Sequence, residues 1–245
     1  NLPRLLAHKD DVVAGLGNGI DFLFKKHGVT RLQGSGRIAA PGRVEVTDDA
    51  GHTQELSGRW IIIATGSDST PLRGVEVDED RIVSSTGALS FPEVPAHLVV
   101  IGAGYVGLEL GSVWRRLGAR VTVVEYLDRI TPGMDVEAAT VLHKALKSQR
   151  FEFRLSQKVV GAAVNGDGVE LLIEPANGGA QDRIHADRVL VSIGRRPFTE
   201  GLNLEQLGVE RDAKGFIKVD DHWRTNVEGI YAIGDVIGGA MLAHK

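Results

Sequence analysis

HLVVIGAGYVGLELGSVWRRLGARVTVVE (residues 97–125) carries the strongest structural signal in the chain. Short apolar runs at residues 98–101 and 121–124 predict two strands, and the residues between them predict a glycine turn followed by a helix. The helix should bury one face, formed by residues at helical spacing: Val106, Leu110, Val113 and Leu117. The stretch therefore predicts a strand–turn–helix–strand unit of an α/β fold.

The turn in this unit has the spacing G-x-G-x-x-G, at Gly102, Gly104 and Gly107. The first glycine permits a tight turn, the second lets the backbone approach a pyrophosphate, and the third lets the helix pack against the strand. The phosphates would lie at the helix N-terminus, where free N–H groups point outward. A glycine-rich turn that binds nothing has the same letters, but the flanking strands, the helix and the acid that follows favour dinucleotide binding.

That acid is Glu125, at the end of the second strand. A carboxylate there accepts hydrogen bonds from the ribose hydroxyls of NAD and repels the additional phosphate of NADP, so the sequence favours NAD. Arg129, four residues further on, is an alternative partner for an NADP phosphate, although it follows the acid and does not replace it. The simplest alternative is that Glu125 only caps an exposed strand.

The sequence leaves two alternative roles open for each of two other acids. Glu109 is expected beside the apolar stripe of the helix, where a carboxylate costs free energy unless it is paired. It either contacts a neighbouring basic group or lies near the nicotinamide end of a bound cofactor, and the spacing leaves both open. Asp235 follows an apolar run at residues 230–233, so it is either a ligand-binding residue at the carboxyl end of a strand or a turn aspartate.

The rest of the chain predicts further alternation of elements. We expect helices at residues 2–26 and 135–150, and a connector between domains at residues 68–96. The apolar run at residues 60–64 predicts a strand buried on both faces of a parallel sheet, although nothing before it supplies a parallel partner. The other expected strands are residues 29–33, 43–47, 52–56, 151–155, 159–164, 169–174, 188–193 and 230–233, with a hairpin turn at 48–51.

Composition excludes several classes of function. The chain is 42% hydrophobic and 24% charged with a net charge of −4, which is typical of soluble domains and argues against nucleic-acid or anionic-membrane partners. No apolar run approaches the roughly 18 residues that a membrane span needs. The absence of cysteine excludes a thiol nucleophile or a redox disulfide within this chain. The eight histidines are scattered without metal-ligand spacing, so we predict no metal site.

Several stretches together resemble one enzyme family, the dihydrolipoamide dehydrogenases, which are flavin-dependent pyridine nucleotide–disulfide oxidoreductases. IIIATGS, IGRRP and YAIGD are shared by the wider superfamily, whereas SSTGAL, GSVWRRLG and MLAHK are typical of the lipoamide enzymes. The matching stretches cover nearly the whole chain: residues 61–67, 82–89, 99–119, 123–135, 191–209 and 230–245.

The resemblance implies an α/β fold with a Rossmann-like NAD domain inserted in an incomplete FAD-binding domain, together with small antiparallel β excursions. Residues 1–88 would be the C-terminal half of the FAD-binding domain, residues 89–198 the NAD-binding domain, and residues 199–245 the start of a central domain that contacts FAD. The parallel partners missing around residues 61–63 would then belong to an absent N-terminal half.

The resemblance also implies cofactor-binding residues. Those expected at FAD are Gly36, Thr65, Gly66, Ser67, Asp235, Met241, Leu242, Ala243 and His244. Those expected at NAD are Gly102, Ala103, Gly104, Tyr105, Val106, Gly107, Leu108, Glu109, Glu125, Val159 and Gly194. Tyr105 corresponds to a residue that gates nicotinamide access to the flavin, and Glu109 to the acid beside it, which favours the functional interpretation of Glu109.

In such enzymes two electrons pass from protein-bound dihydrolipoamide to a redox disulfide, then through FAD to NAD. The resemblance implies a homodimeric parent that acts on lipoyl domains of 2-oxo acid dehydrogenase complexes, in a bacterial cytoplasm or a mitochondrial matrix. This chain departs from the pattern, because it has no cysteine pair, no second G-x-G-x-x-G and no C-terminal domain with a His–Glu acid–base pair.

We therefore expect an internal fragment with no catalytic residue, which binds NAD(H) and holds no FAD. His244 lies in the MLAHK motif and is not the catalytic histidine. The alternatives are a non-catalytic NAD-binding module or another FAD-dependent disulfide reductase. NADPH-dependent reductases of that kind usually carry basic residues at the position of Glu125.

Overall fold

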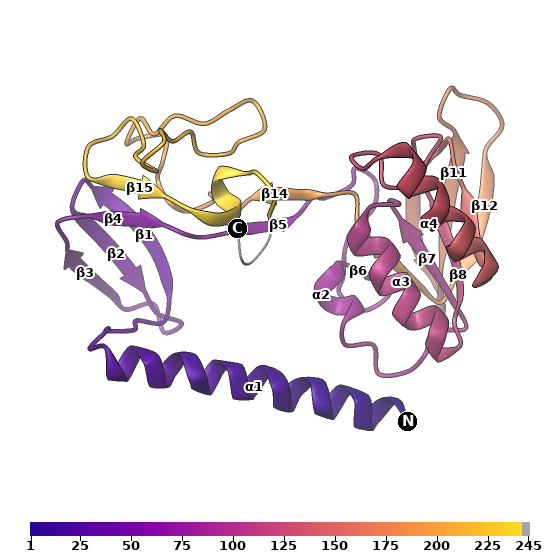
Figure 1. Cartoon of the computed structure of the whole chain (residues 1–245), viewed down its shortest axis with the longest axis horizontal. Coiled ribbons are helices and arrows are strands. Elements are labelled where there is room, and N and C mark those ends of the chain that lie inside the picture. Colours follow the sequence, from indigo (N-terminus) through magenta and orange to yellow (C-terminus); the bar gives the residue numbers. More distant parts are fainter. Residues whose placement is uncertain (242–245) are drawn as a thin grey trace. The chain divides into compact units, whose positions relative to one another are not determined.

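The computed structural model describes residues 1–241 and divides the chain into two compact units (Figure 1). Unit 1 comprises Asn1–Asp10 and Ser69–Gly194. Unit 2 comprises Asp11–Asp68 and the residues from Arg195 onward. Helix α1 (Leu2–Lys26) begins in unit 1 and continues into unit 2, and it has the predicted bounds although none of its residues is buried.

Unit 1 is built on a five-stranded parallel sheet with the strand order β6-β13-β7-β8-β9. The strands are β6 (Ile82–Val83), β7 (His97–Ile101), β8 (Arg120–Val124), β9 (Phe151–Arg154) and β13 (Arg188–Val191). Its helices are α2 (Ser85–Ala88), α3 (Tyr105–Leu117) and α4 (Val136–Ser148). A second sheet is antiparallel: β10 (Gln157–Asn165), β11 (Gly168–Pro175) and β12 (Asp182–Ala186).

The parallel sheet is covered on both faces, as its continuous apolar strands require. Along β7, Leu98 and Val100 belong to a buried cluster that includes Leu108 and Trp114 of α3. The alternate residues Val99 and Ile101 belong to a second buried cluster, which the antiparallel sheet completes. Figure 1 shows α3 and α4 lying across β7 and β8. Unit 1 is therefore a helix–sheet–sheet sandwich.

The buried face of α3 differs in part from the predicted one: Leu110 packs against the core and Val106 is half-buried, but the rest of the predicted stripe is exposed. Val113 and Leu117 are 46% and 36% exposed, and the buried residues are Gly107, Leu108, Gly111 and Trp114. The two glycines let the helix lie close to the sheet, and the indole N–H of Trp114 donates to the Ala88 carbonyl at 2.9 Å. Close approach of the backbone, rather than the most apolar stripe, sets which side of the helix is buried.

Unit 2 combines three small sheets. β1 (Ser35–Ala40), β2 (Arg43–Thr47) and β3 (Thr53–Ser57) form an antiparallel meander, with the predicted turn at residues 48–51. β4 (Ile61–Ile63) pairs in parallel with β15 (Ile230–Ala232), and β5 (Ser67–Ser69) pairs with β14 (Arg195–Pro197). The 3₁₀-helix η1 (Gly234–Ile237) follows β15.

Several sequence predictions for these elements were wrong. Residues 29–33 form no strand, and β12 was missed because its polar sequence DRIHA lacks an apolar run. The strand at residues 60–64 does have a parallel partner in this chain, β15, and it is not buried on both faces because Ile62 is 61% exposed. The expected connector at residues 68–96 contributes β6, the edge strand of the parallel sheet.

Within residues 1–241, no helix has the length and apolar character needed to cross a membrane. The same residues bring together no group of three or more side chains that suits a metal ion.

Candidate dinucleotide site

The glycine loop, residues 102–107, connects the carboxyl end of β7 to α3. Gly102 has φ of +99° and donates its N–H to the Val124 carbonyl at 2.8 Å, which ties the loop to the end of β8. A Cβ at Gly102 would lie 2.6 Å from the Ser192 carbonyl oxygen, and one at Gly107 would overlap the Ser192 hydroxyl. These two glycines are therefore required by packing.

Gly104 is different, because a Cβ built there would meet no atom within 4 Å. It is the N-cap of α3, and no side chain caps this end of the helix. The uncapped N–H groups of a helix favour an anion, and an open backbone lets a phosphate approach them. The local structure thus fits the pyrophosphate of a dinucleotide.

Glu125 lies at the end of β8 and is 9% exposed. Its Oε2 accepts a hydrogen bond from the Ala103 N–H at 2.7 Å, and its Oε1 accepts one from the Leu127 N–H at 2.9 Å. Each carboxylate oxygen can accept further hydrogen bonds, so ribose hydroxyls remain compatible with this arrangement. Arg129, the alternative phosphate partner, donates from Nη2 to the Pro132 carbonyl at 2.7 Å.

The remaining residues expected at NAD differ in how far they are exposed to solvent. Tyr105 and Glu109 are exposed on α3, whereas Leu108 is buried in the core beneath it. Glu109 does not lie at the rim of the buried face, because it is exposed, and within residues 1–241 its side chain makes no hydrogen bond or ion pair. Val159 is buried in the same cluster as Val124, and the carbonyl of Gly194 (φ +133°) accepts a hydrogen bond from the Thr70 N–H.

Part of the residue set expected at FAD comes together in unit 2. The Ser67 hydroxyl donates to Asp235 Oδ2 at 2.6 Å and accepts from Arg195 Nε at 2.6 Å. The Thr65 hydroxyl donates to the Phe198 carbonyl at 2.6 Å, and the Gly66 carbonyl accepts from the Phe198 N–H. Sequence reasoning missed Arg195 as a residue of this group, although the IGRRP motif contains it.

The other members of that set take no part in these hydrogen bonds or lie outside the described residues. Gly36 is on β1, where a Cβ would meet open space, and Met241 is half-buried with φ of +47°. Leu242, Ala243 and His244 lie outside the described residues.

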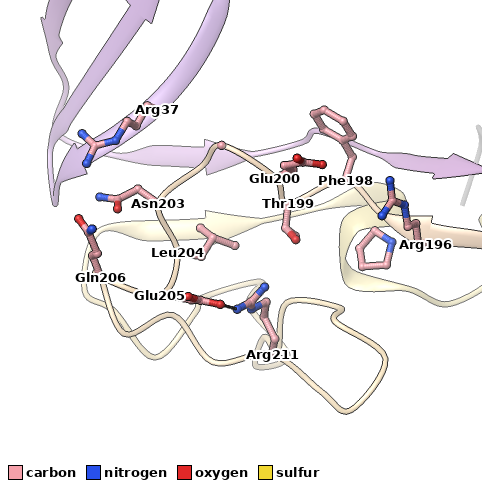
Figure 2. Close-up of a pocket in the computed structure, with 12 residues that line it drawn as sticks. Arg37, Arg196, Phe198, Thr199, Glu200, Asn203, Leu204, Glu205, Gln206 and Arg211 are labelled. Carbon is pink, nitrogen blue, oxygen red and sulfur yellow. Dashed lines mark hydrogen bonds and ion pairs between the residues drawn. The ribbon is translucent and has the colours of Figure 1, made fainter.

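Unit 2 also contains a polar pocket of about 550 Å³ beside this network (Figure 2). Three of its lining residues are arginines, and each is in an ion pair: Arg37 with Glu45, Arg196 with Asp68 and Arg211 with Glu205. Figure 2 shows Arg211 and Glu205 meeting within the pocket. Because every arginine already has an acidic partner, the pocket carries little free positive charge.

A separate polar chain lies at the amino end of the parallel sheet, at the opposite edge from the glycine loop. The His97 ring contacts the His185 carbonyl at 2.7 Å and the Thr122 hydroxyl at 2.9 Å. The Thr122 hydroxyl in turn donates to Glu152, which also accepts from Arg120. Burial lowers the pKa of His97, and Arg120 lowers it further. The hydrogen bond from Arg120 lowers the pKa of Glu152.

The whole sequence resembles known proteins. The family model described as pyridine nucleotide-disulphide oxidoreductase matches residues 3–245. The chain belongs to this family. It is 53% identical to dihydrolipoyl dehydrogenase 3 of Pseudomonas putida, over 100% of this chain and 52% of that protein. It is 52% identical to the mitochondrial dihydrolipoyl dehydrogenase 2 of Arabidopsis thaliana, over 100% of this chain and 48% of that protein.

Solved structures agree with this assignment. LpdA from Mycobacterium tuberculosis superposes with a TM-score of 0.89 at 29% identity, over 100% of this chain and 53% of that one. The HOCl-induced flavoprotein disulfide reductase RclA from Escherichia coli gives 0.86 at 24% identity, which shows the same fold, over 98% and 54% of the two chains. The sequence resemblance to dihydrolipoyl dehydrogenases and the α/β fold are confirmed. The chain spans about half the length of the curated relatives it matches.

Proposed function

We propose that this chain binds NAD(H) at the glycine loop, as the pyridine nucleotide part of a dihydrolipoyl dehydrogenase. The observation that carries this proposal is the open backbone at Gly104, on a helix N-terminus that no side chain caps. The buried carboxylate of Glu125 lies next to it, because it accepts one hydrogen bond from Ala103 of the loop and one from Leu127. When bound, NAD would supply the hydride acceptor, and the residues of this chain would bind it and orient it.

Residues 102–109, Glu125, Val159 and Gly194 would line the NAD site. Tyr105 and Glu109 are four residues apart and exposed, so they share one side of α3. An acid without a partner beside an exposed aromatic ring suits the proposed nicotinamide end, where Tyr105 would control access.

The activity of the whole protein belongs to the same proposal and rests on the relatives. It would be the oxidation of protein-bound dihydrolipoamide with reduction of NAD through FAD, in a homodimer that acts on lipoyl domains. The location would be a bacterial cytoplasm or a mitochondrial matrix, since the matched relatives come from bacteria and from plant mitochondria. This chain, which has no cysteine, would contribute cofactor binding rather than the thiol chemistry.

The FAD side of the proposal assigns residues 1–88 to an FAD domain, 89–198 to an NAD domain and 199–245 to a central domain. The network of Ser67, Asp235 and Arg195 supports an FAD-contacting role, because it brings a hydroxyl, a carboxylate and a guanidinium together beyond the carboxyl ends of β4 and β15. Gly36, Thr65, Gly66 and residues 241–244 complete the proposed set.

A substitution at Glu125 tests the proposed NAD site. In the wild type the Ala103 and Leu127 N–H groups donate to different oxygens of the carboxylate, so in glutamine one of them would face the NH2 group, which is a donor. The substitution also removes the negative charge. In Glu125→Gln we expect NADH affinity to fall about tenfold, the size of a lost charge-assisted hydrogen bond. NADPH should be affected much less, because the repulsion of its phosphate is lost too.

The measurement is isothermal titration of both nucleotides into the wild-type and variant chains. Arg43→Gln on β2 is a matched control, because it also exchanges a charged side chain for an amide, in unit 2. A ratio of NADH to NADPH affinity that is unchanged in Glu125→Gln would count against the ribose role.

A further inference from the structure

One peptide segment of the glycine loop is held from both sides. Ala103 donates its N–H to Glu125 Oε2 at 2.7 Å and accepts at its carbonyl from the Thr131 N–H at 2.9 Å. We call these two hydrogen bonds the Ala103 clamp. Glu125 belongs to the dinucleotide motif, whereas Thr131 lies outside it, in the segment that connects β8 to α4.

Thr131 has a conformation that its own chemistry disfavours. Its φ is +43°, which is rare for a β-branched residue, and Pro132 follows it, which further restricts its backbone. The residue is 4% exposed, and its hydroxyl is buried with no hydrogen-bond partner among residues 1–241. Such costs persist only where surrounding structure enforces them, and they concentrate at functional sites.

The surroundings that enforce this conformation are visible. Ile130 is 1% exposed and lies in the same buried cluster as Ala103 and Leu108. Arg129 donates to the Pro132 carbonyl at 2.7 Å, and the Met134 N–H donates to the Thr131 carbonyl at 2.9 Å. The segment is therefore anchored on both sides of Thr131, with its N–H pointing at the glycine loop.

We propose that Thr131 is a positioning residue for dinucleotide binding, which fixes the glycine loop through the Ala103 clamp. The inference rests on the proposed NAD(H) binding. A clamp on the loop acts on the pyrophosphate part of the site, which NADH and NADPH share. A substitution that loosens the turn at Thr131 should therefore weaken the binding of both nucleotides by the same factor. A substitution of Glu125, in contrast, should change the ratio of the two affinities.

Two substitutions at position 131 distinguish the effect of the backbone conformation from the effect of the hydroxyl group. Thr131→Gly keeps the N–H and tolerates positive φ, but it frees the turn, so the loop must be ordered when the nucleotide binds. Thr131→Val keeps the branched shape and the N–H, and removes only the unpartnered hydroxyl. Arg150→Gly is the matched control, because Arg150 is an exposed residue with φ of +67° that follows α4.

The experiment titrates NADH and NADPH into each purified chain and measures its melting temperature. For Thr131→Gly we expect both dissociation constants to rise together by about three- to fivefold, the scale of glycine's added flexibility. Thr131→Val and Arg150→Gly should keep both within about twofold of wild type, within the spread of surface substitutions. Thr131→Val should also melt at a higher temperature, because a buried unpaired hydroxyl is gone.

The opposing outcomes are distinct. Unchanged affinity in Thr131→Gly, with only the melting temperature altered, means a structural role and overturns the inference while leaving the proposed function intact. Weakened binding in Thr131→Val assigns the effect to the hydroxyl and also overturns it. A wild-type chain that binds neither nucleotide overturns the proposed function and this inference together.

Discussion

At the scale of single residues, the three motif glycines perform different physical tasks. Gly102 and Gly107 lie where a Cβ would collide with Ser192, one against its carbonyl and one against its hydroxyl. Gly104 faces open space with an ordinary φ of −76°. Packing therefore explains two of the glycines and leaves the third for a ligand.

This difference predicts opposite outcomes for two identical changes. Gly107→Ala should lower the free energy of unfolding by about 1–3 kcal/mol, because a methyl group is forced into packed atoms. Gly104→Ala should cost about 1 kcal/mol or less, the difference between glycine and alanine at an N-cap, yet abolish most NADH binding because the methyl lies where the pyrophosphate approaches. Urea unfolding and NADH titration of both variants check this pair, and full NADH affinity in Gly104→Ala would contradict it.

At the scale of elements, α3 shows how a helix can be predicted correctly while its buried face is predicted only in part: Val106 and Leu110 are half-buried, whereas Val113 and Leu117 are exposed. The stripe of Val106, Leu110, Val113 and Leu117 satisfies helical periodicity, so periodicity alone selects it. The structure instead buries Gly107, Gly111 and Trp114, because small residues let the helix axis approach the sheet and leave room for one large ring. No count of apolar residues contains that information.

The polar chain across the parallel sheet predicts a pH dependence of stability. Burial lowers the pKa of His97 in the folded state below its ordinary value of 6.5, with Arg120 acting in the same direction and His185, Glu152 and Asp187 opposing it. Below about pH 6.5 the unfolded state therefore binds more protons than the folded state. The contribution of His97 to the free energy of unfolding is fully present above that pH and is lost as the pH is lowered. Burial and Lys147 lower the pKa of His143 too, with the same sign.

We expect His97→Gln to flatten this dependence. Melting temperatures measured from about pH 7.5 to about pH 5.5, the range in which histidine titrates, should fall less in the variant than in wild type. His8→Gln, at an exposed position of α1, is the control and should retain the wild-type slope. If the melting temperature of His97→Gln depended on pH as steeply as that of wild type, the polar chain would not contribute to the pH dependence of stability.

At the scale of the whole molecule, the chain contains two compact units and one complete dinucleotide motif. Unit 1 has two buried clusters that enclose its parallel sheet, and it carries the glycine loop. Unit 2 has its own core around β4 and β15, but within residues 1–241 β4 pairs with β15 alone, and Ile62 is exposed. The chain spans about half the length of the curated relatives it matches, and its sequence contains no second G-x-G-x-x-G.

Two cores of this kind predict two transitions in differential scanning calorimetry. A ligand raises the melting temperature of the unit that binds it, so NADH should shift the transition of unit 1 alone. The chain should purify without flavin colour, and added FAD should shift neither transition. Gly104→Ala identifies the transition of unit 1, because it should lose the NADH shift. A yellow protein, or one in which FAD shifts the transition of unit 2, would refute the expectation that this chain holds no FAD.

The sequence alone determined the α/β class, the strand–turn–helix–strand unit at residues 97–125 and the family, because local periodicity and glycine spacing are written in consecutive residues. Only the tertiary structure decided which face of α3 is buried, that β4 finds its neighbour in β15, and that Thr131 and Glu125 hold Ala103. The last two features depend on contacts between residues far apart in the chain: 22 positions from Ala103 to Glu125 and 169 positions from Ile61 to Ile230. Such contacts form only when packing brings distant segments together, so no pattern along the sequence records them.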